Sequence, residues 1–168
     1  YLATLFELTG SNAAAAKKDA DLVYDIDKQL AASHKTRVER RDVHANYNKM
    51  AVTDLEKRQP NIGWSNFLQN LGAQTDSIDV GQPAYYDKLN ELLKTISIDN
   101  WKLYLKANAI DAYATDLSKP FVDADFEFAK VISGQSVQKS RGEKMASAVD
   151  NYLGEALGQL YVKKYFPE

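Results

Sequence analysis

Apolar side chains recur at three- and four-residue steps along most of the chain, the spacing that gathers them on one face of an α-helix. The pattern is clear from Asn12 to about Ala32, where lysines and aspartates occupy the opposite face. Gly10 can adopt the left-handed geometry that ends the preceding helix, and Ser11 is the expected N-cap of this one. The predicted buried face comprises Ala16, Ala20, Val23, Ile26 and Leu30.

Shorter helices are predicted in the middle of the chain. Thr53 and Glu56 have the spacing of a capping box, which would start a helix that Pro60 ends. A second short helix is predicted over residues 63–72, and Pro83 suits the first turn of a helix that continues to about residue 95. The polar residues 33–50 indicate an irregular connection rather than a helix, and Ile78 with Val80 indicates a brief extended segment.

Residues 99–117 carry the strongest helical signal, with two apolar strips. A helix that is apolar on two sides is expected to lie between other helices. Pro120 separates it from a helix over residues 121–134 that Gly134 ends, and a last helical region begins near Val137. The fold class is therefore all-α, an array of about seven or eight helices with a trace of β-structure at most. The two strips are Leu103, Ala107, Ile110, Ala114 and Leu117, and Trp101, Tyr104, Leu105, Ala109 and Tyr113.

The last predicted helix carries an apolar stripe that runs almost to the final residue. Gly154 and Gly158 form a GxxxG pattern on it, which in a soluble chain predicts the close approach of another backbone. We therefore expect this helix to be enclosed, either by its own domain or by a longer protein from which the sequence has been cut. The stripe consists of Leu153, Leu157, Leu160, Tyr161 and Tyr165.

Composition narrows the function classes. A chain of 168 residues with 45% apolar and 26% charged residues is globular and fits one domain, so residues 1–168 are assigned to one domain. The net charge of -2 argues against nucleic acid or an anionic membrane as partner. The lack of cysteine excludes disulfides, thiolate zinc sites and a cysteine nucleophile. No run approaches the roughly 20 apolar residues of a spanning helix, and any signal or anchor is expected upstream of Tyr1.

The spacing of the candidate metal-binding and catalytic residues in the sequence does not predict that they lie close together. His34 and His44 are ten residues apart in the polar connection and cannot share a helical face, so they are interpreted as surface histidines. Asp123, Asp125 and Glu127 could act as a general acid and base, but their helical context favours a solvated rim. We expect no catalytic, metal-binding or cofactor-binding residue in the chain.

A charged cluster lies in the polar connection. Its basic side chains could hold an anion, but interleaved acids favour an internal network of ion pairs and hydrogen bonds that fixes the connection. The cluster comprises Arg37, Glu39, Arg40, Arg41 and Asp42.

Four segments in this order resemble the neprilysin family of zinc metallopeptidases, most closely its bacterial oligopeptidase members. They are "TRVERRDVHANYNKM" from Thr36, "VGQPAYYDKLNELL" from Val80, "WKLYLKANAI" from Trp101 and "VDNYLGEALGQLYVKKYFPE" from Val149. The resemblance covers essentially the whole chain and identifies it as the N-terminal helical part. One departure is Gly142 after Arg141, where family members often carry tryptophan. The lack of cysteine is unlike the vertebrate members and points to a bacterial one.

The resemblance implies an enzyme of two lobes around a chamber, with zinc on an HExxH helix of the other lobe. The helical lobe would cover the site and admit only small peptides. Asn108-Ala109-Ile110 partly matches the family's Asn-Ala-aromatic substrate-binding segment, but Ile110 is not aromatic and a buried helix is expected there, so the match is rejected. Zinc is thus implied for the parent enzyme and not for this fragment.

The hypothesis is a covering-lobe fragment of a zinc metalloendopeptidase, with residues about 153–168 leading toward an absent catalytic lobe. Its implied partners are peptide substrates of the parent and that lobe in cis. The implied location is the periplasm, cell envelope or exterior, with the cytoplasm as the alternative. The rival hypothesis is a free-standing helical interaction module without peptidase activity.

Overall fold

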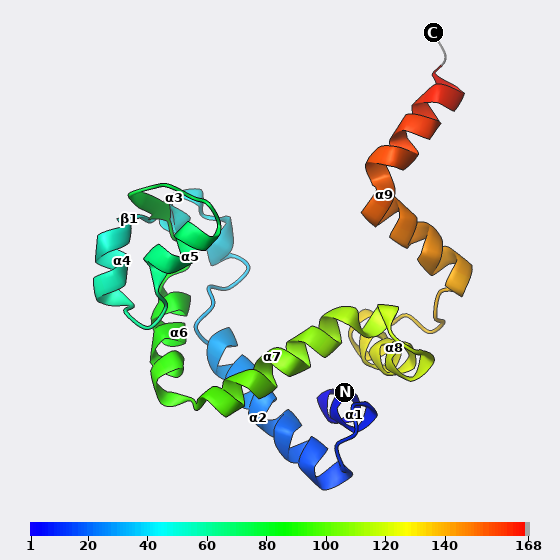
Figure 1. Ribbon diagram of the computed structural model, residues 1–168, viewed down its shortest axis with the longest axis horizontal. Coiled ribbons are helices and arrows are strands. Elements are labelled where there is room, and N and C mark those ends of the chain that lie inside the picture. The colour runs from blue at the N-terminus through cyan, green and yellow to red at the C-terminus, as the bar shows by residue number, and fades with distance from the viewer. Residues whose placement is uncertain (167–168) are drawn as a thin grey trace. The chain divides into compact units, whose positions relative to one another are not determined.

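The computed structural model describes residues 1–166 and confirms a mostly helical chain (Figure 1). Within these residues lie nine α-helices, two 3-10 helices and one two-stranded sheet. The chain divides into two units, Tyr1–Ala124 and the part from Asp125 onward. The elements are α1 (Leu2–Leu8), α2 (Ala13–Ala31), η1 (Glu39–Arg41), α3 (Val43–Asn46), β1 (Lys49–Ala51), α4 (Val52–Arg58), α5 (Trp64–Asn70), β2 (Ser77–Asp79), α6 (Pro83–Thr95), α7 (Ile98–Tyr113), η2 (Ala114–Asp116), α8 (Lys119–Ser133) and α9 (Arg141–Tyr165).

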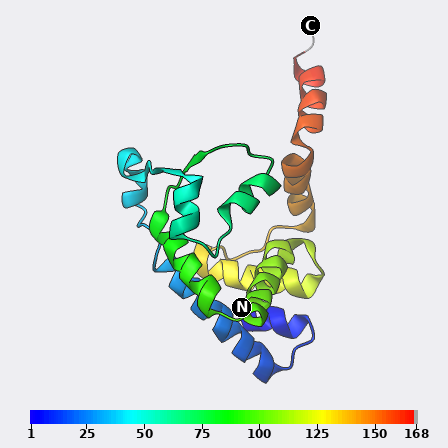
Figure 2. The same cartoon turned by 60° about the vertical axis from the view of Figure 1, so that its left-hand side comes forward.

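Helix α2 packs against α1 and α7 (Figures 1 and 2). All five residues of its predicted apolar face are buried, which confirms the helical periodicity. The first three contact Phe6 of α1 and Ala107 of α7 in one cluster. The N-cap is Asn12 rather than Ser11, because the Asn12 side chain accepts a hydrogen bond from the Ala15 N–H at 2.9 Å.

The C-terminal half of α2 contacts α6. Ile26 and Leu30 pack on Leu92, and Trp101 and Tyr104 of α7 border this cluster. The Tyr104 hydroxyl donates a hydrogen bond to Asp27 at 2.9 Å. Burial, assisted by the Asp27 carboxylate, raises the pKa of Tyr104 to about 12. Helix α2 therefore contributes to two apolar clusters in succession along its length.

A third cluster joins α4, α5 and the small sheet, with Val52, Leu55, Trp64, Leu68 and Val80 at its centre. Strands β1 and β2 are antiparallel, with Met50 opposite Ile78. The extended segment predicted around residue 78 is confirmed. Its partner strand begins in the connection that was predicted to be irregular, and η1 and α3 also lie there, so that prediction is wrong for residues 39–41, 43–46, 49 and 50.

The predicted capping box of α4 is wrong. The helix begins directly after β1, with Ala51 as its N-cap and no side-chain cap. The Glu56 carboxylate instead accepts a hydrogen bond from the Ser65 N–H at 2.6 Å, at the start of α5. The strand ends at Ala51 and α4 begins at Val52, one residue before Thr53, with the Val52 N–H donating to the Asp76 carbonyl just beyond the strand pair.

A buried amide connects α4, α5 and α6. Gln59 is fully buried, and its oxygen accepts a hydrogen bond from the Trp64 indole N–H at 3.0 Å. Its amide nitrogen donates to Asp87 at 2.7 Å, and Arg58 donates to the same carboxylate through two nitrogens. Both ends of the buried amide are thus satisfied, as burial of a polar group requires.

Helix α7 departs from the prediction of two buried strips. Ala107 is buried and Leu103 is half-buried, but Leu105 and Tyr113 are each 63% exposed in the described structure. The helix also ends at Tyr113 and is followed by η2, four residues before the predicted end. The second strip is therefore covered by the described residues only at its start, at Trp101 and Tyr104.

The last helices follow the predicted boundaries closely. Pro120 lies in the first turn of α8, where its missing N–H removes no intrahelical bond. Gly134 ends α8 with a φ of 72°, as predicted. A capping box of Ser140 and Glu143, which the sequence analysis missed, starts α9. Residues 1–166 contain nine α-helices instead of seven or eight because α3 forms inside the polar connection.

The two tryptophans provide a matched test of the buried amide. Trp64→Phe removes the donor to Gln59, whereas the buried N–H of Trp101 has no hydrogen-bond partner among the described residues. We expect Trp64→Phe to lower the free energy of unfolding by about 1–3 kcal/mol more than Trp101→Phe, because an unsatisfied buried acceptor is left only in the first variant. Urea unfolding followed by far-UV circular dichroism measures both values.

The double variant Trp64→Phe, Gln59→Leu is the control. Its destabilisation should be smaller than the sum of the two single effects, since the acceptor and the donor are removed together. Equal losses in Trp64→Phe and Trp101→Phe would contradict the role assigned to the Gln59 amide.

The Arg58–Asp87 pair predicts acid sensitivity. The Arg58 hydrogen bond, with that of Gln59, holds the pKa of Asp87 below its ordinary value. A carboxyl whose folded pKa is lowered stabilises the fold above its unfolded pKa of about 4, and this stabilisation is lost as the pH falls through the folded pKa. Asp87→Asn should therefore have a lower free energy of unfolding than the parent at pH 7. The difference between the two free energies should decrease as the pH is lowered, as measured by urea unfolding at each pH.

The matched control for this prediction is Asp54→Asn, because Asp54 and Lys57 form a longer, more exposed pair at 3.5 Å. The free energy of unfolding of this variant should differ little from that of the parent, both at pH 7 and at acid pH. If the difference in free energy of unfolding between Asp87→Asn and the parent stayed constant with pH, the Asp87 carboxylate would not stabilise the fold through its charge.

Candidate functional site

The two histidines lie in different surroundings and are both exposed. The His34 ring stacks on Tyr85 with 4.6 Å between centroids, and its Nδ1 lies 3.2 Å from the Gln82 side-chain oxygen. His44 is in the single turn of α3. No three His, Asp or Glu side chains gather into a possible metal site anywhere in residues 1–166. The residues present therefore do not fit a zinc ion.

Two of the three acids of α8, Asp123 and Glu127, form ion pairs with lysines of the same helix. Asp123 pairs with Lys119 one turn earlier, and Glu127 pairs with Lys130 at 2.6 Å. Pairs of this spacing stabilise a solvated helix face. Two of the three candidate acids are thus engaged with lysines on α8, and the solvated-rim interpretation stays a prediction.

The partial match at residues 108–110 is on the surface of α7, so the expectation of a buried helix there was wrong. Asn108 and Ala109 are exposed. The Asn108 amide donates a hydrogen bond to the Tyr104 carbonyl of the same helix at 2.9 Å. Its hydrogen-bonding capacity is thus partly used within the helix.

The predicted ion-pair network of residues 37–42 does not form. Glu39 accepts hydrogen bonds from the backbone N–H and the hydroxyl of Thr36, each at 2.7 Å, and Asp42 caps α3 by accepting from the Ala45 N–H at 3.0 Å. None of the ion pairs within residues 1–166 includes Arg37, Arg40 or Arg41. The hydrogen-bonded part of the prediction is confirmed, and the ionic part is wrong.

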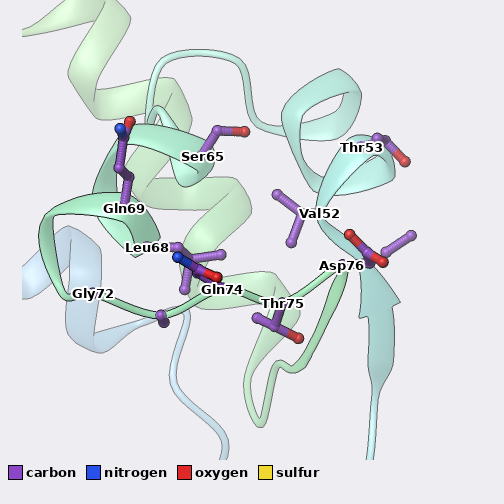
Figure 3. Close-up of a pocket in the computed structure, with 11 residues that line it drawn as sticks. Val52, Thr53, Ser65, Leu68, Gln69, Gly72, Gln74, Thr75 and Asp76 are labelled. Atoms are coloured by element: carbon purple, nitrogen blue, oxygen red, sulfur yellow. The ribbon is translucent and has the colours of Figure 1, made fainter.

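A surface pocket of about 660 Å³ lies between the start of α4 and the segment that follows α5 (Figure 3). Val52 and Leu68 form its apolar part, while Thr53, Ser65 and Thr75 contribute hydroxyl groups. Asp76 is its single ionisable lining residue. The pocket therefore offers no pair of groups for acid–base chemistry and no metal-binding set.

The described residues after Ala114 form no core of their own. From residue 115 to residue 166 no side chain is buried, although α8 and α9 together carry many large apolar residues. The five residues of the predicted stripe on α9 are between 41% and 66% exposed. Isolated helices of this kind are marginally stable in water, so their apolar faces are a candidate interaction surface. We call the stripe Leu153, Leu157, Leu160, Tyr161 and Tyr165 the α9 stripe.

The close backbone approach predicted at Gly154 and Gly158 is not present in the described structure, where a Cβ atom at either position would meet nothing within 4 Å. Within the described residues nothing encloses the helix at these two positions, so enclosure by its own domain is not seen, and enclosure by a longer protein stays a prediction. Leu153, just before the first glycine, has non-helical φ and ψ of -125° and 21°, so α9 bends there. No described helix is long and apolar enough to cross a membrane.

Comparison with known proteins identifies the family of the chain. A family model described as Peptidase family M13 matches residues 1–168. The chain belongs to this family. The match to its N-terminal part confirms the resemblance to neprilysin-like metallopeptidases and the all-α fold class.

Individual M13 relatives agree over nearly the whole chain. The neutral endopeptidase of Lactobacillus helveticus is 27% identical over 165 residues, covering 98% of this chain and 26% of the relative. Human endothelin-converting enzyme 1 is 26% identical over 167 residues, covering 96% and 22%. The zinc metalloprotease Zmp1 of Mycobacterium tuberculosis, solved in an open state, matches with a TM-score of 0.90 at 29% identity, covering 99% and 26%. The chain thus spans about a quarter of these M13 proteins.

The uncovered α9 stripe predicts self-association of the M13 chain. At high concentration the chain should form dimers or larger species, because apolar side chains on different copies bury one another. Multi-angle light scattering measures the mass, and Leu157→Lys with Leu160→Lys should return it to the monomer.

Lys17→Glu with Lys18→Glu, on the solvated face of α2, is the matched control and should leave the association unchanged. A monodisperse monomer at all concentrations would show that α9 buries its stripe within its own chain.

Proposed function

We propose that this chain is part of the helical lobe of a zinc metalloendopeptidase that hydrolyses small peptides. In this role it would wall the substrate chamber and restrict access, while catalysis takes place in another part of the parent. The proposal treats residues 1–168 as one fragment of the covering lobe. The end of α9 would lead toward the catalytic lobe.

The observation that carries the proposal is the absence of buried residues from 115 to 166 in a chain of the M13 family. A helix with an apolar face is stable in a globular protein because that face packs on a neighbour. The relatives are about four times longer than this chain, so a complete member has further residues to provide that neighbour. We infer that α8 and α9 contact the rest of the parent in cis.

The proposed role is one of exclusion and positioning. A rigid helical wall limits the size of what can enter a chamber, so folded proteins would be rejected and small peptides admitted. The wall also keeps bulk water out, which strengthens electrostatic interactions inside. The residues of this chain would form the wall of the chamber and exclude water from it, and they would contribute no reacting group.

Zinc enters the proposal only for the parent. The relative from M. tuberculosis is named a zinc metalloprotease, and the metal would be held by residues outside this chain, since the two histidines here do not converge with a third ligand. For the parent we infer a place in the periplasm, the cell envelope or outside the cell, with the cytoplasm as the alternative. The name of one relative, membrane metallo-endopeptidase-like 1 of Mus musculus, supports an envelope location.

The purified 168-residue chain should neither retain stoichiometric zinc nor cleave peptides, because its potential ligands are dispersed. Dialysis against metal-free buffer followed by elemental analysis, and incubation with a mixed peptide library read by mass spectrometry, measure the two properties. Retention of one zinc per chain would contradict the proposal.

The coding sequence downstream of Glu168 provides an independent test. It should encode an HExxH motif, in which two histidines one helical turn apart hold zinc and the glutamate acts as base. A stop codon or an unrelated domain at that place would overturn the peptidase assignment and support the free-standing interaction module.

A further inference from the structure

Residues 31–51 form regular structure but no apolar core. None of them is buried, yet the segment folds into η1, α3 and β1. Polar contacts fix it: the Asn46 amide donates to the carbonyls of Glu39 and Asp42, and the Lys35 ammonium donates to the Ala45 carbonyl at 2.9 Å. A surface segment held by its own backbone bonds keeps its outward side chains in a fixed arrangement, as binding loops do.

The acids of this segment are engaged by local donors, and the arginines are not neutralised. The Thr36 hydroxyl and N–H hold the pKa of Glu39 below its usual range, and Asp42 is bound at the start of α3. Five basic and two acidic side chains lie between residues 33 and 50, in a chain of net charge -2. Among the described residues no carboxylate forms an ion pair with Arg37, Arg40 or Arg41, and all three are exposed.

Large apolar side chains lie among these arginines. Val38, Val43 and Tyr47 are 76%, 78% and 63% exposed. Arginine and tyrosine are enriched at the centres of protein–protein interfaces, where an apolar contact and a charge-assisted hydrogen bond act together. The arginine surface is defined as Arg37, Val38, Arg40, Arg41, Val43 and Tyr47.

We propose that the arginine surface docks a carboxylate-rich segment of the parent polypeptide, outside residues 1–168. This rests on the proposed function, under which about three quarters of the parent lies outside the chain. The partner is inferred from charge complementarity, because the planar guanidinium groups can bind carboxylates through two parallel hydrogen bonds. An anionic membrane fits less well, since the rest of the chain is negatively charged and would be repelled by an extended anionic surface.

The test uses the 168-residue chain and a fluorescent synthetic peptide in which glutamates flank leucine. Anisotropy should show binding that is about tenfold tighter than that of the same peptide with glutamine for glutamate. Arg40→Ala with Arg41→Ala should weaken the binding of the glutamate peptide about tenfold or more, because two charge-assisted contacts are lost. Tyr47→Ala should weaken it several-fold.

Two further variants make the result specific. Lys163→Ala with Lys164→Ala removes the same charge from another adjacent basic pair and should change the affinity less than about twofold. Arg40→Lys with Arg41→Lys keeps the charge but loses the bidentate geometry, so its affinity should fall between those of the parent and the alanine variant. Circular dichroism confirms that each variant is folded.

Three results would overturn the docking proposal. The first is equal binding of the two peptides, or no loss in the alanine variant. The second is arginine-dependent sedimentation with phosphatidylglycerol vesicles in the absence of peptide binding, which would assign the surface to a lipid. The third is arginine-dependent self-association without peptide binding, which would assign it to a second copy of this chain.

Failure of this proposal is distinguishable from failure of the proposed function. An HExxH motif downstream with no peptide binding removes only the docking surface. Peptide binding with no such motif would leave a charged interaction surface on a helical module that is not a peptidase.

Discussion

The structure depends on where its apolar surface can be buried. All three apolar clusters lie before residue 115, and α2 connects two of them because its buried face runs along nearly its whole length. Beyond Ala114 the described chain has helices with apolar faces and no buried residue. Burial of apolar surface is the main favourable term in folding, so the two parts of the chain differ in the source of their stability. The first has its own core, and the second has none within the described residues.

The buried polar group in the first unit has a different function from the apolar clusters. Gln59 is enclosed by residues of α4, α5 and α6, and it binds donor and acceptor groups of Trp64 and Asp87 at once. Apolar packing is tolerant of small shifts, whereas a buried amide is satisfied only when both partners are in place. The amide therefore fixes how these short helices meet, although each is too short to be stable alone.

Sequence periodicity predicted the helices that bury one continuous face and failed where local hydrogen bonds decide the structure. The five buried residues of α2 were predicted because a long amphipathic pattern allows one orientation. The Thr53–Glu56 capping box was wrong, while the same spacing at Thr36 and Glu39 forms reciprocal bonds that were not predicted. In the first case α4 begins at Val52, whose N–H donates to the Asp76 carbonyl, and local sequence patterns do not include this distant partner. The exposure of α9 was not predictable either, since an apolar stripe indicates burial and does not say which part of the protein covers it.

In residues 37–42, opposite charges that are close in the sequence do not form ion pairs, so the number of acids and bases does not predict an ionic network. Glu39 and Asp42 stand beside three arginines in the sequence, yet backbone N–H groups are nearer and their positions are fixed, so the carboxylates bind these donors and the arginines remain exposed. The result is a pair of uncovered surfaces with different chemistry, the arginine surface and the α9 stripe, in separate units of the chain. Apolar contact supplies affinity with little directional preference, whereas charged contacts select orientation and register. Under the proposed function, a lobe that closes on its parent in one arrangement would use both kinds of contact, whereas the interaction module of the rival hypothesis would have no parent to close on.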